Sequence, residues 1–177
     1  MTFHIATPTL PLCDSDLAHY PIRRIICIGR NYADHAKEMG QVFIAGTNKE
    51  APPFFFYKPL TALYPVTASS PEPQLWPKPN YSQNIHHELE VCVAIGHKIS
   101  LNQSNQINDM NNAIAGAGIA LDMTCRDTQK TAKEGGRPWA TAKGFDYSAP
   151  CSALMACDWQ GLQKTPDFAL YKNNQRV

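Results

Sequence analysis

The sequence predicts one domain rich in β-strands, with short helices between them. The chain has 177 residues, which suits a single domain with a sizeable core. Its apolar fraction is 44% and its charged fraction 18%, which is typical of a globular protein rather than a disordered one. Several β-branched or alternating apolar runs end at glycine or proline, as strands commonly do.

The charge balance and the apolar runs exclude several classes of partner. The net charge is +1 and basic runs are absent, so we expect no nucleic-acid partner. No apolar run approaches the ~20 residues of a membrane helix, and residues 1–4 carry no signal-peptide pattern. The six cysteines form no C-x-x-C pair, which favours reduced thiols over disulfides or zinc. We therefore expect a cytoplasmic protein.

The first third of the chain predicts two strands around a short helix. Residues 1–20 are a proline-containing lead-in of weak pattern, and residues 24–29 are a β-branched run that ends at a glycine. Asn31 is a plausible N-cap and Gly40 a plausible stop, which predicts a short helix between them. Residues 53–59 are an aromatic run closed by proline, which predicts a buried strand.

The stretch 85–96 carries the clearest strand pattern. Apolar and other residues alternate along it, so Glu88 and Glu90 share one face. Two carboxylates side by side repel each other, so a positive group is expected between them. Taken alone, the pair favours a solvated strand face, on which Glu-x-Glu is common.

The middle of the chain predicts helix, strand and helix. Apolar residues at helical spacing predict a helix over about 104–115. Residues 119–124 read as a strand that contains Asp122, an acid that is costly in an apolar run unless it is paired or binds a metal ion. Residues 127–134 predict a short helix that ends at two glycines.

The remaining segments carry weaker signals. Residues 142–146 predict a strand end or a loop, and residues 147–167 show no clear period. Residues 168–177 predict a strand, a hairpin turn and the first residue of a return strand.

Three features are candidates for chemistry: the pair Glu88 and Glu90, the buried acid Asp122, and His35 with Glu38, which are i, i+3 neighbours on the predicted short helix. Each has a structural alternative, namely a solvated strand face, a satisfied buried acid and a surface histidine. Only their combination with other motifs favours function.

Six ordered motifs supply that combination. They are residues 28–35 (IGRNYADH), 58–59 (KP), 86–90 (HHELE), 121–129 (LDMTCRDTQ), 136–139 (GRPW) and 142–146 (AKGFD). With these motifs the chain resembles the fumarylacetoacetate hydrolase family, and it is most similar to the short single-domain acylpyruvate hydrolases and oxaloacetate decarboxylases. The resemblance extends from about residue 24 to the end of the chain.

The resemblance implies a fold and a metal site. The implied fold is α+β, with layered β-sheets of the fumarylacetoacetate hydrolase C-terminal-domain type, over residues 21–177 after the lead-in. Glu88, Glu90 and Asp122 are implied ligands of one Mg²⁺ or Mn²⁺ ion. Family members usually form dimers, so a homodimer is expected.

The resemblance also implies the residues around a substrate. His35, paired with Glu38 on a lid helix, would handle water, and Lys143 would act beside the substrate. The other implied substrate-binding residues are Arg30, Asn31, Tyr32 and Gln129.

The implied activity is metal-dependent hydrolysis of the C–C bond of acylpyruvate-like 2,4-diketo acids, which gives pyruvate and a carboxylic acid. Three alternatives stay open: oxaloacetate decarboxylation or keto–enol tautomerisation at the same site, and an inactive truncated remnant. Family members continue past the terminal hairpin with a helix, further strands and a Thr-Gly-Thr-Pro motif. We therefore expect a fold that lacks the last strands, with poor solubility and little turnover.

Overall fold

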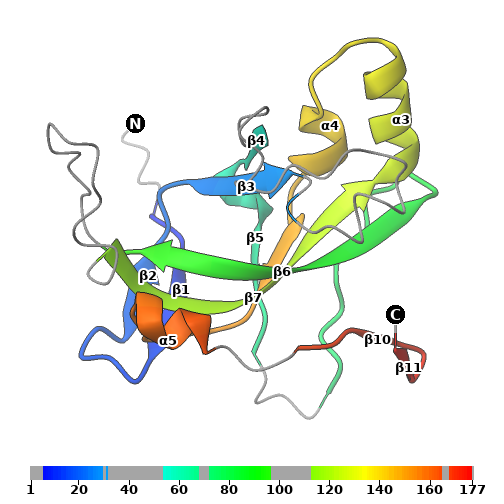
Figure 1. Ribbon diagram of the computed structural model, residues 1–177. Coiled ribbons are helices and arrows are strands. Elements are labelled where there is room, and N and C mark those ends of the chain that lie inside the picture. Colours follow the sequence, from blue (N-terminus) through cyan, green and yellow to red (C-terminus); the bar gives the residue numbers. More distant parts are fainter. Residues whose placement is uncertain are drawn as a thin grey trace, which may run out of the picture.

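The computed structural model describes residues 6–29, 31, 54–67, 72–96, 113–164 and 168–176. The fold is α+β, as predicted: a curled sheet carries helices at one end and along one side (Figure 1). None of the helices in these ranges is long and apolar enough to span a membrane.

Two long antiparallel strands form the centre of the fold. They are β6 (Ile85–Ile95) and β7 (Ile114–Cys125). The alternating pattern of residues 85–96 predicts β6 correctly, and the strand expected over 119–124 is confirmed as the end of β7. The register places Glu88 opposite Asp122.

β7 begins where the sequence predicted the end of a helix. Ile114 and Ala115 are already in the strand, so the helix expected over 104–115 cannot reach them; residues 97–112 lie outside the described ranges. The two glycines that suggested a helix end instead permit close packing in the sheet. A Cβ added at Gly116 would lie 2.7 Å from the main-chain oxygen of Met155 on the neighbouring strand.

β7 lies inside a seven-stranded sheet and has neighbours on both of its edges. One of its edges pairs with β6, and the other pairs with β8 (Ala149–Cys151) and β9 (Leu154–Met155). β5 (Leu63–Pro65) extends the sheet beyond β8, while β1 (Thr9–Cys13) and β2 (His19–Pro21) extend it beyond β9.

The N-terminal segment, whose sequence pattern is weak, contributes β1 and β2 to this sheet. β1 pairs in parallel with β9, and Leu10 and Leu12 are buried. Its strand signal is hidden because the apolar positions are interrupted by proline. The core cluster of the described residues comprises Leu10, Leu12, Ile22, Ala62, Leu63, Ala94, Ala149, Cys151 and Leu154.

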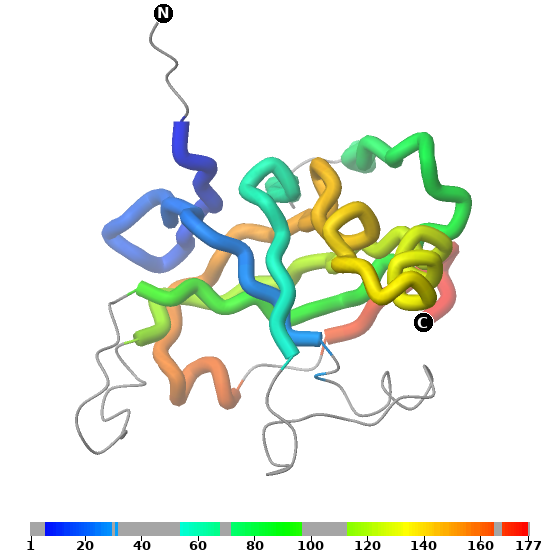
Figure 2. The backbone as a smooth tube through the Cα atoms, turned by 90° about the horizontal axis from the view of Figure 1, so that it is seen from above, coloured from blue at the N-terminus to red at the C-terminus, as the bar shows by residue number. Residues whose placement is uncertain are grey.

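A separate two-stranded ribbon crosses the sheet (Figure 2). It consists of β3 (Ile25–Gly29) and β4 (Phe54–Lys58), both of which were predicted as strands. The aromatic run, however, is not buried as a whole: Phe55 and Tyr57 project outward and are half exposed or more. One face of a ribbon only two strands wide faces outward, so alternate side chains are exposed.

Short helices complete the described structure. α3 (Arg126–Glu134) confirms the helix predicted there, and α4 (Ala140–Lys143) corrects the strand end or loop expected over 142–146. A single helical turn is too short to show a period. A 3-10 turn (Leu60–Ala62) follows β4. The N-cap of α5 (Trp159–Gln163) is Asp158, whose carboxylate accepts from the Gly161 N–H.

The terminal hairpin is confirmed. β10 (Tyr171–Lys172) and β11 (Gln175–Arg176) are joined by Asn173 and Asn174, both in the left-handed region at φ 51° and 63°. Asparagine tolerates this conformation better than most residues, which explains the turn. The predicted short helix between Asn31 and Gly40 lies outside the described residues, apart from Asn31 itself.

Candidate active site

The acidic side chains lie on the packed face of the β6–β7 pair. Directly opposed residues in an antiparallel pair project from the same face, so Glu88 and Asp122 point the same way, and Glu90 follows two residues along. Ala94, on the same face of β6, is buried in the core. The acids are therefore not on the solvated strand face that the sequence left open as an alternative.

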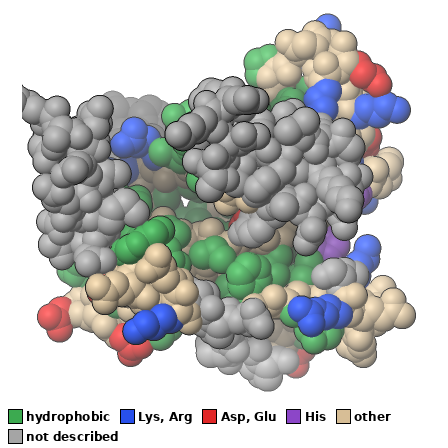
Figure 3. All heavy atoms as spheres, in the orientation of Figure 1, with side chains coloured by type: hydrophobic (Ala, Val, Ile, Leu, Met, Phe, Trp, Pro, Cys, Tyr) green, Lys and Arg blue, Asp and Glu red, His purple; other side chains and the backbone are tan. Residues whose placement is uncertain are grey.

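The opposite face of the pair is apolar. Val93 and Ile119 project from it, as does Met155 on the neighbouring β9, and they are 39%, 44% and 51% exposed. Hydrophobic side chains also gather at the centre of the molecular face shown in Figure 3. The usual pattern of apolar residues inward and polar residues outward is thus inverted along this part of β6, as is expected where buried polar groups form a site.

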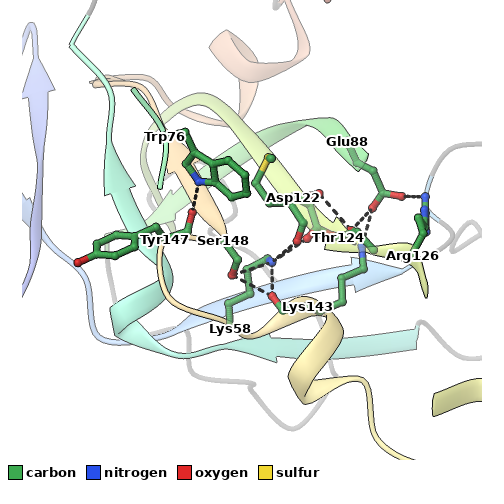
Figure 4. A network of polar contacts seen from close by, with 10 residues as sticks. Lys58, Trp76, Glu88, Asp122, Thr124, Arg126, Lys143, Tyr147 and Ser148 are labelled. Carbon is green, nitrogen blue, oxygen red and sulfur yellow. Dashed lines mark hydrogen bonds and ion pairs between the residues drawn. The ribbon is translucent and has the colours of Figure 1, made fainter. Parts of the chain in front are cut away.

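Lys143 joins two of the acids (Figure 4). It is the last residue of α4, and its Nζ lies 2.5 Å from Glu88 Oε2 and 2.5 Å from Asp122 Oδ2. Only 4% of the residue is exposed. A buried ammonium is costly to desolvate, and two carboxylates at this distance offset that cost. The same ammonium lies 5.1 Å from the centroid of the Phe56 ring.

Lys58 forms a second cationic contact on the other side of Asp122. It is the last residue of β4, and its Nζ lies 2.8 Å from Asp122 Oδ1. The ammonium and the carboxylate oxygen form an ion pair, but their relative orientation does not make a hydrogen bond. The ammonium also donates to the main-chain oxygens of Met123 and Lys143 and to Ser148 Oγ. Burial lowers the pKa of Lys58, and the Asp122 carboxylate opposes that shift.

Arg126 binds Oε1, the second carboxylate oxygen of Glu88. It is the first residue of α3, and its guanidinium forms an ion pair with Glu88 Oε1 and donates to Gln129 Oε1 at 2.9 Å. Thr124 Oγ1 donates to Glu88 Oε2 at 3.2 Å. Gln129, one turn along α3, is buried beside the site at 4% exposure.

Cys27 on β3 lies near the same charges. Burial raises the pKa of its thiol to about 11, and the negative charge of Asp122 adds to the rise. The thiol is therefore neutral at physiological pH, so it is not poised as a nucleophile.

The structure brings together several of the residues that the sequence singled out. Glu88, Asp122, Lys143 and Gln129 form one buried cluster. Glu90 projects from the same face and is half-buried. Asn31 is exposed. The other candidates lie outside the described residues: Arg30, Tyr32, His35 and Glu38.

The donor chemistry of the cluster fits a hard divalent cation. Carboxylate oxygens are the ligands that Mg²⁺ and Mn²⁺ prefer. Within the described ranges, no three Asp, Glu, His or Cys side chains stand close enough to form a ready metal site. The oxygens of Glu88 and Asp122 are held instead by Lys143, so a metal ion at these oxygens would compete with that ammonium.

Four members of this network are not among the residues singled out from the sequence. Lys58 and Arg126 both occur in the quoted motifs, and Thr124 and Ser148 complete their contacts. One signal could have identified Lys58: a lysine that closes an aromatic strand is expected to need a buried partner. Nothing local distinguishes Arg126 from a surface arginine.

Comparison with known proteins identifies a matching family and several relatives. The model of the family described as "Fumarylacetoacetate (FAA) hydrolase C-terminal" matches residues 24–171. The oxaloacetate tautomerase of Escherichia coli is 36% identical over 161 residues, which are 90% of this chain and 67% of that protein. The mitochondrial oxaloacetate decarboxylase of Dictyostelium discoideum is 37% identical over 136 residues, which are 77% of this chain and 56% of that protein.

Solved structures give the same result. The fumarylpyruvate hydrolase of Pseudomonas aeruginosa, solved in complex with Mn²⁺ and pyruvate, superposes with a TM-score of 0.75 and 37% identity. The match covers 88% of this chain and 62% of that one. The chain thus spans about two thirds or less of the length of these proteins.

Proposed function

The chain belongs to the fumarylacetoacetate hydrolase family, and from this premise we propose that it acts on 2-keto acids with a second carbonyl group, with the aid of a divalent metal ion. The observation that carries the proposal is the Lys143 ammonium between the Glu88 and Asp122 carboxylates on the packed face of the sheet. Charged groups buried in this way are uncommon unless they are paired or functional.

Glu88, Glu90 and Asp122 are the proposed ligands of the metal ion, either Mg²⁺ or Mn²⁺. Support comes from their oxygen donors and from the Mn²⁺ ion named for the Pseudomonas hydrolase. The bound ion would act as a Lewis acid toward the keto oxygen of the substrate.

Lys143 and Arg126 are the proposed anchors for the substrate carboxylate. Both are cations with little exposure to solvent, so their attraction for an anion is weakly screened. Gln129 Oε1 already accepts from Arg126, which leaves its amide NH₂ group to donate to a substrate oxygen.

His35 is the proposed base, and Glu38 is proposed to orient it and raise its pKa. A histidine titrates near neutral pH, so it can accept a proton from water at working pH. For an acylpyruvate, the oxygen of this water adds to the distal carbonyl carbon and the adjacent C–C bond breaks. The bonding electron pair and one proton go to the fragment that becomes pyruvate.

Tautomerisation or decarboxylation of oxaloacetate is the second candidate. The names of the Escherichia coli and Dictyostelium relatives favour it. Oxaloacetate also has a keto group next to a carboxylate, so the same anchors would bind it. Neither of these reactions needs the attack of water on a carbonyl.

The test uses the 177-residue protein with each substrate. The loss of acetylpyruvate and the keto–enol conversion and decarboxylation of oxaloacetate are followed by absorbance, with Mg²⁺, with Mn²⁺ and with a chelator. We expect turnover of at least one substrate that needs the metal ion, at a low rate because the chain spans about two thirds or less of the length of its relatives. Turnover of neither substrate by folded, metal-loaded protein would contradict the proposal and would favour a non-catalytic remnant.

A further inference from the structure

We propose that Lys58 is a positioning residue, which holds the carboxylate of Asp122 and the end of the helix that carries Lys143 in one fixed arrangement. The inference rests on the proposed function, because it assigns Asp122 to the metal ion and Lys143 to the substrate. It concerns a residue that touches neither the metal ion nor the substrate in that proposal.

The contacts of Lys58 extend to several parts of the fold (Figure 4). Its side chain is 1% exposed. The ammonium donates to Met123 O at 3.3 Å on β7, to Lys143 O at the end of α4, and to Ser148 Oγ at 3.1 Å just before β8. An ammonium has three donors, so these three acceptors use its full hydrogen-bonding capacity.

Ser148 closes the arrangement. Its hydroxyl accepts from Lys58 and donates to Lys143 O at 3.0 Å. The main-chain oxygen of Lys143 is therefore fixed from two directions. Because Lys58 also lies 2.8 Å from Asp122 Oδ1, one side chain links the positions of Asp122 and Lys143.

Lys143 makes a different set of contacts. Its ammonium contacts the two carboxylates Glu88 and Asp122, which are the proposed metal ligands. Lys58 and Lys143 thus carry the same charge beside the same aspartate, but only the Lys58 ammonium binds the main chain of two other elements. This difference separates an electrostatic role from a positioning role.

The two roles predict opposite signs for metal binding. Removing a positive charge near the ligands strengthens the binding of a cation by Coulomb's law. Removing a group that orients a ligand weakens metal binding, typically by about 10- to 100-fold. If Lys58 positions Asp122, the loss of orientation should outweigh the Coulomb gain.

The experiment is a calorimetric titration of Mn²⁺ into the wild type and three methionine variants. We expect Lys58→Met to bind Mn²⁺ about 10- to 100-fold more weakly. Lys143→Met should bind it more tightly, because a competing ammonium is removed. Lys130→Met is the matched control. The Lys130 side chain is 78% exposed on α3, so this variant should bind Mn²⁺ with the affinity of the wild type.

Tighter or unchanged Mn²⁺ binding by folded Lys58→Met would overturn the proposal, and so would an absence of Mn²⁺ binding by the wild type. If Lys58→Met shows no cooperative thermal unfolding, Ser148→Ala decides, since it removes one acceptor of Lys58 and keeps the ion pair with Asp122. A several-fold weakening by Ser148→Ala supports the proposal, and unchanged affinity overturns it. The titration measures Mn²⁺ binding and not turnover. Failure of the proposed activity would therefore appear in the substrate assays and not in this experiment.

Discussion

Glu88 on β6 and Asp122 on β7 are paired directly across the antiparallel register, and Lys143 lies 2.5 Å from both. The two carboxylates would repel each other if they were left alone. The ammonium at the end of α4 neutralises that repulsion and ties the helix to the sheet.

Lys143→Met should separate metal binding from turnover. The variant removes a cation that competes for the carboxylates, and it also removes the proposed anchor of the substrate. We expect kcat/KM to fall by about 10- to 100-fold, the range for a lost hydrogen bond to a charged group. Steady-state kinetics at saturating Mn²⁺ provide the measurement, and an unchanged kcat/KM would remove Lys143 from the site.

His35→Ala should distinguish the two candidate reactions. It removes the proposed base and leaves the proposed ligands intact, so Mn²⁺ affinity should stay the same. Hydrolysis of acetylpyruvate should be abolished, whereas decarboxylation of oxaloacetate should suffer less because it needs no attacking water. Equal losses in both reactions would contradict the role assigned to His35.

Asp127 should contribute to stability in a pH-dependent way. The Ser82 hydroxyl and the Gln83 N–H donate to its carboxylate at 2.6 and 2.9 Å, and they lower its pKa from 3.8 to about 2. A carboxyl group with a lower pKa in the folded state stabilises the fold above its unfolded pKa, and this contribution is lost as the pH falls toward 2.

The measurement for Asp127 is the Tm of the wild type and of Asp127→Asn across a pH series. The variant should be less stable at neutral pH, and the difference should shrink as the pH falls from 3.8 toward 2. A difference that is the same at every pH would show that ionisation of Asp127 does not contribute.

Gly118→Ala should destabilise the sheet. A Cβ at this position would lie 2.8 Å from Ala153 O and 2.9 Å from Ser152 Oγ, and the main-chain oxygen cannot easily move. We expect a loss of about 1–3 kcal/mol in the free energy of unfolding, measured with urea.

Gly135→Ala is the matched control for Gly118→Ala. Gly135 has a φ of −89°, and its nearest atoms would be 3.4 Å from an added Cβ. Its substitution should therefore leave the free energy of unfolding within about 0.5 kcal/mol. Similar losses in the two variants would show that the close approach at Gly118 is not the cause.

The sequence predicts the elements with a clear period or a clear turn signal and misses several of the short ones. The alternation around Glu88 predicts β6, and the β-branched run before Gly29 predicts β3. α4, β8 and β9 have four, three and two residues, which is too few to establish a helical or strand period. They form because α4 packs against β7 and β4 and because β8 and β9 pair with β7, and a linear pattern does not contain that information.

The site was predictable in its residue types but not in its pairing. Two glutamates two residues apart must share a strand face, and an acid in an apolar strand must find a partner. The partner of Asp122 could not be read from spacing, because Lys58 and Lys143 are distant in sequence and meet only through tertiary packing. The resemblance to a family supplied the metal assignment, which the pattern alone left open.

The most direct test of the central claim is a calorimetric titration of Mg²⁺ and Mn²⁺ into the wild type, Glu90→Gln and Glu134→Gln. Glutamine keeps the shape of glutamate and removes one negative charge. Glu134 lies at the end of α3 with its side chain 66% exposed, so its substitution controls for the change in net charge. We predict binding by the wild type and Glu134→Gln and at least about 10-fold weaker binding by Glu90→Gln. Equal affinities in all three proteins would contradict the claim that this sheet face binds the metal ion.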